Sequence, residues 1–221
     1  MNTKQVVAVI GASGNMGSAF ARNLSKGNYR ILLRSSKTDA IQSLLNEIKN
    51  NLYSADIEVV DDVIEACWEA DVIILAVPYV AEKRIAETIR SVVNQKVVIS
   101  ISNPLNDHRD RLLTQPGISA AEELQRQLPN SKVVKAFNTV FANDFDQPVI
   151  QEQRLDCFIA GDDENALEVV DDLVRATGFN PVIAGGLSVS GTLESMQFLL
   201  IQLVMQSKYK RTIGWKILQD S

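Results

Sequence analysis

Three glycines, Gly11, Gly14 and Gly17, stand close together directly after a short apolar run. Glycine permits positive φ and close backbone approach, and the free N–H groups at the start of a following helix bind anions. The spacing is G-x-x-G-x-x-G rather than the commoner G-x-G-x-x-G. A strand-like run precedes the turn and a helical segment at about 15–24 follows it, so we expect a pyrophosphate site here rather than a ligand-free corner. Its candidate residues are Gly11, Ser13, Gly14, Asn15, Met16 and Gly17.

The second strand-like run ends in Arg34, Ser35, Ser36 and Lys37. An NAD-binding site usually places an acidic residue here, on the ribose 2′-hydroxyl, whereas the first acid in this chain is Asp39. Two cations and two hydroxyls suit a 2′-phosphate instead, because charge-assisted hydrogen bonds are the strong ones. We therefore expect NADP as the cofactor; the alternative is a solvated loop.

Polar residues and prolines follow three further strand-like runs, at ends that should meet at one crevice. Asn103 and Asn138 are expected to present amides to the nicotinamide side, and Tyr79 to pack against the cofactor; alternatively, Asn103 and Asn138 only stabilise turns. The candidate cofactor-binding residues of these segments are Ala76, Val77, Pro78, Tyr79, Asn103, Pro104 and Asn138.

Residues for acid–base or metal chemistry are scarce. Tyr79 and Lys83 have the spacing of a dehydrogenase acid–base pair, but no serine stands a dozen residues before them. The only histidine, His108, lies in a charged loop, and Cys67 and Cys157 have apolar neighbours. We predict no catalytic side chain and no metal site. Hydride transfer between two redox cofactors requires alignment and little proton chemistry.

Strand-like and helical segments alternate along the chain, which predicts an α/β, doubly wound, mostly parallel Rossmann sheet with helices on both faces. Residues 1–184 are expected to form the NADP-binding domain, and residues 185–221 a small C-terminal helical appendage. Helices are expected after Thr38 as an N-cap, after the capping-box pattern at Ser119, and over 166–176. The expected strands are 6–10, 30–33, 57–59, 72–77, 97–101, 133–137, 157–160 and 181–183.

The composition is that of a globular protein, with 221 residues, 46% hydrophobic, and a net charge of −5. No cluster of five or more basic residues exists, so nucleic-acid binding is not expected. The N-terminus lacks a signal-peptide layout, which predicts a cytoplasmic protein. The apolar run 193–205 is expected to be too short to span a bilayer. Because it is apolar on several helical faces, we expect it to pack across a homodimer interface.

Seven short segments together resemble the coenzyme F420-dependent NADP oxidoreductases and their relatives. They cover residues 5 to about 205 and are 11–17, 76–78, 102–105, 134–139, 160–162, 184–188 and 193–194. This resemblance implies a Rossmann domain whose small C-terminal part completes the substrate pocket and a dimer. It also implies deazaflavin F420, or a flavin, as the small-molecule hydride acceptor, stacked near Thr139, Leu187 and Ser188. One departure is Ser36, where the deazaflavin enzymes tend to carry arginine.

The sequence leaves two other functions open. One is an NADPH-dependent reductase of another small carbonyl, imine or quinone, with Tyr79 or His108 supplying a proton. The other is a non-enzymatic NADP-binding sensor. An open pocket lined by Asn103, Asn138 and Leu187 would favour the enzyme, and a sealed nicotinamide face would favour the sensor.

Overall fold

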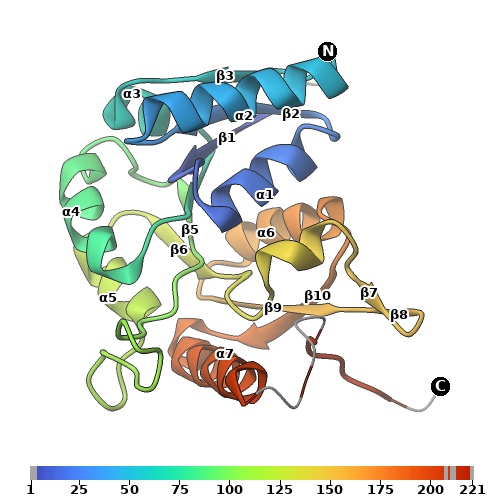
Figure 1. The fold of residues 1–221 in the computed structure, drawn as a ribbon. Coiled ribbons are helices and arrows are strands. Elements are labelled where there is room, and N and C mark those ends of the chain that lie inside the picture. The colour runs from blue at the N-terminus through green and yellow to red at the C-terminus, as the bar shows by residue number, and fades with distance from the viewer. Residues whose placement is uncertain (1–3, 207–208, 210–212, 220–221) are drawn as a thin grey trace.

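The computed structural model describes residues 4–206, 209 and 213–219. In these residues one eight-stranded sheet has the order β10-β9-β6-β5-β4-β1-β2-β3, and β7 and β8 form a separate two-stranded sheet (Figure 1). The strands are β1 Gln5–Ile10, β2 Tyr29–Arg34, β3 Ile57–Val59, β4 Val72–Leu75, β5 Val97–Ser100, β6 Lys132–Lys135, β7 Val149–Ile150, β8 Gln153–Arg154, β9 Asp156–Gly161 and β10 Asn180–Gly185. The helices are α1 Asn15–Leu24, α2 Thr38–Asn51, α3 Val63–Glu69, α4 Tyr79–Ile89, α5 Ala120–Gln127, α6 Glu164–Ala176 and α7 Ser190–Met205, with 3-10 turns η1 Ala142–Phe145 and η2 Leu187–Val189.

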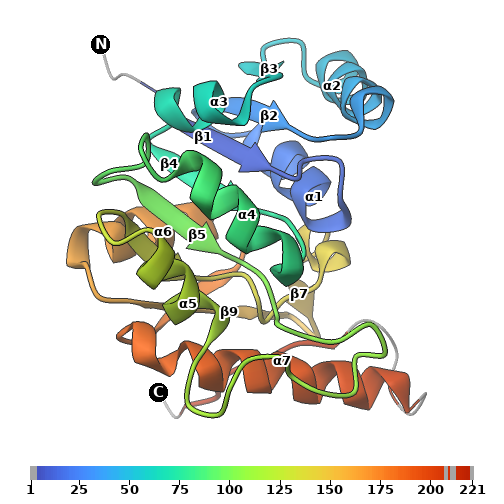
Figure 2. The same ribbon diagram turned by 90° about the vertical axis from the view of Figure 1, so that its left-hand side faces the viewer.

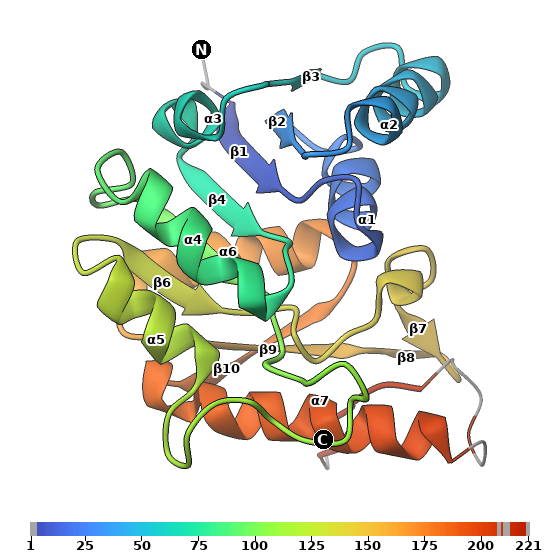
Figure 3. The ribbon, with the colours of Figure 1, turned by 60° about the vertical axis from the view of Figure 1, so that its left-hand side comes forward.

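Helices cover both faces of the large sheet (Figures 2 and 3). Alternate residues of each strand pack on opposite faces: Val7 and Val9 of β1 join one core with α1, α2 and α6, whereas Ala8 and Ile10 join the other with α3, α4 and α5. Helix α7 packs on β9 and β10 through a third cluster that includes Phe158. The doubly wound, mostly parallel fold is therefore confirmed, with strands buried on both faces.

Strands β9 and β10 run parallel to each other, and β9 pairs antiparallel with β6. Ala160 lies opposite Lys135 at the carboxyl end of β6, and Gly185 lies opposite Ala160. Helix α7, which follows Gly185 after one 3-10 turn, therefore begins level with the carboxyl ends of the parallel strands. Figure 3 shows it passing beneath the segment that follows β5. This reversal places a helix along the edge where an α/β sheet binds its ligands.

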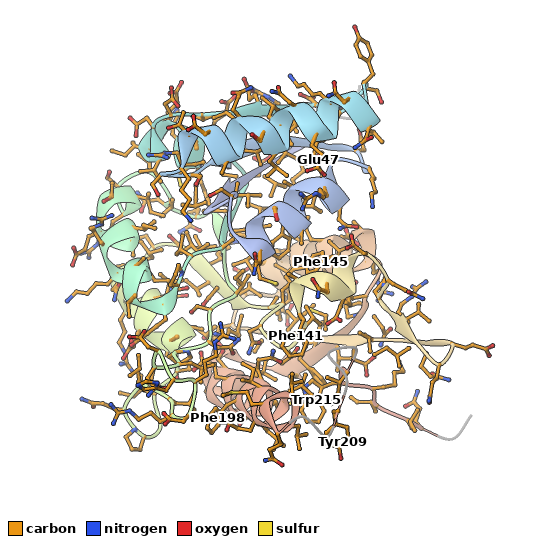
Figure 4. All side chains as sticks on the ribbon, viewed as in Figure 1. Glu47, Phe141, Phe145, Phe198, Tyr209 and Trp215 are labelled. Carbon is orange, nitrogen blue, oxygen red and sulfur yellow. The ribbon has the colours of Figure 1, made fainter. Side chains whose placement is uncertain are left out.

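The C-terminal segment 213–219 returns to the outer end of β9 at Asp156. The Asp156 carboxylate is fully buried and accepts hydrogen bonds from Asn180 Nδ2 (2.6 Å), Lys216 Nζ (2.8 Å) and Ile217 N (2.6 Å). Burial would raise the Asp156 pKa, but these hydrogen bonds, led by that from Lys216, lower it below its ordinary value. Trp215 packs with the third cluster beside α7 (Figure 4).

Two expectations about helices need correction. Thr38 is the first residue of α2 rather than its N-cap, which is Lys37, and no side chain caps this helix. The apolar run also extends further than expected: Leu187–Met205 spans 19 residues of mean hydropathy 1.3, long and apolar enough to cross a membrane by length and composition alone. In the structure its start packs against the sheet and buries Glu194 and Gln197. The strands β7 and β8 and the turn η1 were not predicted, because they lack a long apolar period.

The capping box at Ser119 allows a direct test of helix stabilisation. The Ser119 hydroxyl accepts from Glu122 N at 3.1 Å, and Glu122 Oε2 accepts from Ser119 N at 2.9 Å. Ser119→Ala should lower the free energy of unfolding by about 1 kcal/mol, because the Glu122 amide loses its side-chain acceptor, whereas the bond from Ser119 N to the Glu122 carboxylate remains. Thr38→Ala, at an uncapped helix start, is the matched control and should change it by less than about 0.5 kcal/mol. Urea unfolding of both variants measures the difference; equal losses would contradict the assigned cap.

Candidate functional site

The glycine turn joins β1 to α1 in space that a side chain would fill. Gly11 has a φ of 90°, and a Cβ there would lie 2.3 Å from the carbonyl oxygen of Ala76. A Cβ on Gly17 would lie 2.3 Å from the carbonyl oxygen of Gly11. Both positions therefore require glycine, because β4 and α1 approach the turn too closely for any other residue.

The N-terminus of helix α1 is suited to bind an anion. Its N-cap is Gly14, whose lack of a side chain leaves the helix start uncapped, and its first turn has no acidic residue. The amides of Asn15, Met16 and Gly17 have no acceptor within the helix, as in the first turn of any α-helix. These N–H groups and the helix dipole favour a negative group such as a pyrophosphate.

The end of β2 lies against the same turn. The carbonyl oxygen of Arg34 accepts from Gly11 N (2.8 Å) and Ala12 N (3.1 Å), and the Ser13 and Ser35 hydroxyl oxygens are 2.5 Å apart. The Arg34 guanidinium donates to the carbonyl oxygen of Ser35, and its Nε is buried without a partner. Ser36 and Lys37 are exposed beside it. A buried unpaired guanidinium nitrogen next to hydroxyls and a second cation fits the 2′-phosphate of NADP.

The segment after β4 lines the other side of the glycine turn. Ala76 N donates to the carbonyl oxygen of Ile10 at 2.8 Å, which holds this segment against β1. Ala76 and Val77 are half-buried and Pro78 is exposed, immediately before α4 begins. Ala76 and Val77 therefore lie directly beside Gly11 of the glycine turn, and their role in cofactor binding, like that of Pro78, stays a prediction.

Asn103 and Asn138 are brought together, but they bind each other. Asn103 Nδ2 donates to the backbone carbonyl of Asn138, and Asn138 Nδ2 donates to Asn103 Oδ1, both at 3.0 Å. Asn138 Nδ2 also donates to the carbonyl oxygen of Leu193 on α7 at 3.0 Å, and Asn138 is 1% exposed. The pair therefore links the ends of β5 and β6 to α7. The buried Asn138 Oδ1 has no partner, and Pro104 is buried beside the pair.

Phe137, directly before Asn138, has an unusual backbone conformation. It has a φ of 59°, an unfavourable left-handed conformation for a bulky residue. Its ring packs edge-on to Phe20 at 4.8 Å and stacks on Phe145 at 6.0 Å, the latter labelled in Figure 4. Such strain persists where the surroundings hold a residue on several sides, and it clusters at functional sites.

A buried ion pair lies behind the asparagines. Lys135 Nζ donates to Glu194 Oε1 at 2.7 Å and to the carbonyl oxygen of Ser102 at 2.6 Å, and neither charged side chain is more than 1% exposed. Glu194 Oε1 also accepts from Ala120 N at 3.0 Å. Sequence reasoning missed this pair. The sequence features that could have predicted the pair are a lysine at the end of an apolar strand and a glutamate inside an apolar helix.

Glu82 on α4 is the third buried charge-bearing group in this region. Burial raises its pKa to about 7, an effect that the nearby Lys135 cation opposes. Its Oε1 lies 3.5 Å from the Ser100 hydroxyl. The nearby Glu194 carboxylate adds to the effect of burial, so the two together outweigh the Lys135 cation and keep the Glu82 pKa above its ordinary value.

Tyr79 does not lie as expected. Its hydroxyl donates to Glu123 Oε2 at 2.6 Å, so the side chain points into a cavity of about 270 Å³ between α4 and α5. Burial and the Glu123 carboxylate raise the Tyr79 pKa above its ordinary value, whereas a proton donor activated by Lys83 would have a lowered one. The geometry thus disfavours the tyrosine–lysine pair. His108 is exposed, and Cys67 and Cys157 are buried with pKa values raised to about 12 by burial.

The three residues expected beside the acceptor differ in exposure. Thr139 is fully buried with its hydroxyl unpartnered, and Leu187 is 3% exposed in the core beneath α5. Ser188 is exposed and lines a cavity of about 560 Å³ between residues 112–119 and the start of α7. Among the described residues, the lining of this cavity includes none of Asn103, Asn138 and Leu187.

A βαβ unit with a glycine turn, a free helix N-terminus and a strand end suited to a 2′-phosphate defines a dinucleotide-binding protein of the Rossmann class. A sequence model described as NADP oxidoreductase coenzyme F420-dependent matches residues 6–104, which contain this unit.

Relatives extend the match over nearly the whole chain. An F420-dependent NADP reductase of Methanocaldococcus jannaschii is 33% identical over 93% of this chain and 95% of its own length. One from Methanothermobacter marburgensis is 26% identical over 92% and 94%. A solved structure of a candidate F420-dependent NADP reductase from an Arthrobacter species has a TM-score of 0.84 and covers 98% of this chain and all of its own, at 17% identity. The chain belongs to the coenzyme F420-dependent NADP oxidoreductase family.

The raised pKa of Glu82 predicts a pH-dependent stability. The folded protein holds this proton more tightly than the unfolded chain, so the contribution is present below the ordinary pKa of 4.5 and is lost as the pH rises through about 7. Glu82→Gln stays neutral. Its stability relative to the wild type should therefore rise between pH 5 and pH 8, by about 2–3 kcal/mol.

Chemical unfolding at several pH values measures this change. Glu87→Gln, at an exposed position of the same helix, is the control and should show a flat difference. A Glu82→Gln difference that is equally flat would show that Glu82 is ionised in the folded protein throughout this range.

Proposed function

We propose that this protein is an NADP(H)-dependent oxidoreductase that transfers a hydride between nicotinamide and a flat redox acceptor, the deazaflavin F420 or a flavin. The observation that carries the proposal is the cofactor cradle in a chain of this family. Gly11 and Gly17 bring the turn backbone close to β4 and α1, the Arg34 Nε is unpaired, and the hydroxyl of the next residue, Ser35, lies 2.5 Å from that of Ser13.

Each part of the chain has a defined role in this proposal. The amides of residues 13–17 bind the pyrophosphate, and Arg34, Ser35, Ser36 and Lys37 bind the 2′-phosphate. The segment 76–79 and the Asn103–Asn138 pair form the nicotinamide side, Tyr79 through its backbone. When bound, the nicotinamide supplies the hydride; the protein holds the donor and acceptor carbons close together and excludes water. Thr139, Leu187 and Ser188 support the acceptor as part of the wall formed with α7.

The C-terminal residues 185–221 complete this wall against the nucleotide-binding domain of residues 1–184. We further propose that the protein acts in the cytoplasm as a homodimer. Helix α7 supports the dimer, because its sheet-facing side buries Ser190, Glu194 and Gln197, whereas Leu199 and Met205 are 50% and 56% exposed. An apolar outer face on a helix favours a second covering surface.

Reduction of another carbonyl, imine or quinone is less well supported, because the proton donor it would use is absent from the described site. The Tyr79 hydroxyl is bound to Glu123 and His108 is exposed on a loop. A sensor without a second substrate is disfavoured by the relatives, because they are reductases and this chain matches almost all of their length.

Anaerobic mixing tests the proposed function. The protein and NADPH are combined separately with F420, FMN, FAD and a quinone, and NADPH oxidation is followed by absorbance. F420 or a flavin should be reduced fastest. Oxidation by the quinone alone would favour the alternative reductase, and no oxidation with any acceptor would favour the sensor.

Cofactor choice gives a quantitative prediction. Hydrogen bonds to charged groups contribute about 1.5–3 kcal/mol each. Two such contacts, discounted for solvent exposure, should favour NADPH over NADH by at least about 100-fold in affinity. Arg34→Ala should weaken NADPH binding by roughly tenfold or more and leave NADH nearly unchanged. Ser36→Asp should bring both cofactors near parity, because a carboxylate repels the phosphate.

Fluorescence titration of both cofactors measures these affinities. Ser36→Ala is the matched control, since it removes a donor without adding charge, and it should retain most of the preference. Equal wild-type affinities for NADPH and NADH would show that this strand end does not bind the 2′-phosphate.

A direct hydride transfer requires no tyrosine proton donor. Tyr79→Phe should keep the turnover within about tenfold, because loss of a true general acid costs about 10²–10⁴-fold. His108→Ala should behave in the same way. Steady-state kinetics at saturating NADPH measures both variants, and a hundredfold loss in either with unchanged NADPH affinity would overturn the direct transfer.

The dimer is tested at the exposed face of α7. Leu199→Glu should convert a dimer to monomers, because it buries a charge in the proposed contact. Val80→Glu, at a 75% exposed position on α4, is the matched control and should leave the dimer intact. Analytical ultracentrifugation at micromolar concentration gives the mass. A monomeric wild type would exclude this interface.

A further inference from the structure

A closed ring of contacts surrounds the end of β6. Lys135 Nζ binds the carbonyl oxygen of Ser102, and the next residue, Asn103, exchanges hydrogen bonds with Asn138. Asn138 Nδ2 binds the carbonyl oxygen of Leu193, and the next residue, Glu194, binds Lys135 Nζ. We call these six residues the Lys135 ring. It joins β5, β6 and α7 through four side chains, each of which bonds to another element.

The start of α5 is bonded to the Lys135 ring. Glu194 accepts from Ala120 N at 3.0 and 3.2 Å, so the same carboxylate fixes that helix and the ammonium group of Lys135. The chain between Lys135 and Asn138 contains Phe137, whose φ of 59° is held by the ring on both sides. Each member thus has little freedom to move without breaking a buried polar contact, which is costly.

We propose that Lys135 and Glu194 are positioning residues for hydride transfer. They set the distance between α7, which forms the acceptor wall, and the Asn103 segment, which forms the nicotinamide side. The inference rests on the proposed function. Neither residue is placed to touch the nicotinamide or the acceptor, because both are at most 1% exposed. Their effect comes through the length and bonding of the Glu194 side chain. Misplacement of a reacting group by about 1 Å can cost about 10²-fold in rate.

Two conservative variants separate length from charge. Glu194→Gln keeps the side-chain length and an acceptor oxygen for Ala120 N, but loses the charge. Glu194→Asp keeps the charge and shortens the side chain by one methylene. If position matters, Glu194→Asp should slow single-turnover hydride transfer about 10–100-fold. Glu194→Gln leaves the buried Lys135 ammonium group without a counterion and should lower stability, but its transfer rate should fall less than that of Glu194→Asp, and both variants should keep the NADPH dissociation constant within about threefold.

Two readouts do not depend on turnover. Hydrogen–deuterium exchange of residues 101–104 and 138–139 should rise in Glu194→Asp more than in Glu194→Gln. F420 binding, measured by its fluorescence, should weaken in the same order. Lys132→Met is the matched control, because it removes another lysine ion pair of β6. Lys132 pairs with Asp163 at 3.1 Å, and both side chains are partly exposed. It should change none of these quantities.

The outcomes are distinguishable. Transfer rates and exchange within threefold of wild type in both Glu194 variants, or a Gln variant more impaired than the Asp variant, would overturn the positioning role. A wild type that reduces neither F420 nor flavins would refute the proposed function. The exchange measurements would still show whether Glu194 holds residues 101–104 and 138–139 in place. Where Glu194→Asp lowers NADPH affinity as much as the transfer rate, the effect is general loosening and the proposal fails.

Discussion

A single buried ammonium group constrains the carboxyl edge of the sheet. Lys135 ends a core strand, and its charge cannot remain buried without partners, because desolvation of an ion costs several kcal/mol. The partners come from β5 and α7, and the carboxylate that neutralises it also binds the start of α5. Three elements distant in sequence must therefore meet at one point. The reversed direction of β9 and β10 makes this possible, since it brings α7 back to the end of β6.

The two halves of the proposed cofactor site are built by different means. The phosphate half depends on backbone: amide groups at α1, glycines without Cβ atoms, and a strand end held by Gly11 and Ala12. The nicotinamide half depends on side chains that bond each other across elements, Asn103 with Asn138 above all. The first half is fixed by local conformation. The second depends on long-range packing and thus on the position of α7.

This difference explains how much the sequence predicted. The alternation of strands and helices along the chain, the Rossmann class and the glycine turn were predictable, because periodicity and glycine spacing are local signals. The positions of Tyr79 and Leu187 were not, because each depends on which helix packs beside it. Tyr79 lies at the start of α4, yet its hydroxyl donates a hydrogen bond to Glu123 of α5. No spacing along the chain records a partner 44 residues away. The Asn103–Asn138 pair was expected near the cofactor, but its mutual bonding arises only when β5 and β6 are neighbours.

Helix α7 shows why composition alone gave an incomplete description. Its apolar residues indicated burial on more than one side, and the structure adds which side carries the polar groups. Ser190, Glu194 and Gln197 face the sheet, where Glu194 binds Lys135, whereas Leu199 and Met205 remain exposed. The buried side of the helix thus mixes these polar residues with Leu193 and Leu200, unlike the apolar stripe of an ordinary amphipathic helix. Such a helix obtains specificity from its inner polar contacts, which fix its register against β6. In the proposed dimer the exposed Leu199 and Met205 gain stability when a second surface covers them, so the proposed acceptor wall and the proposed assembly depend on different faces of one helix.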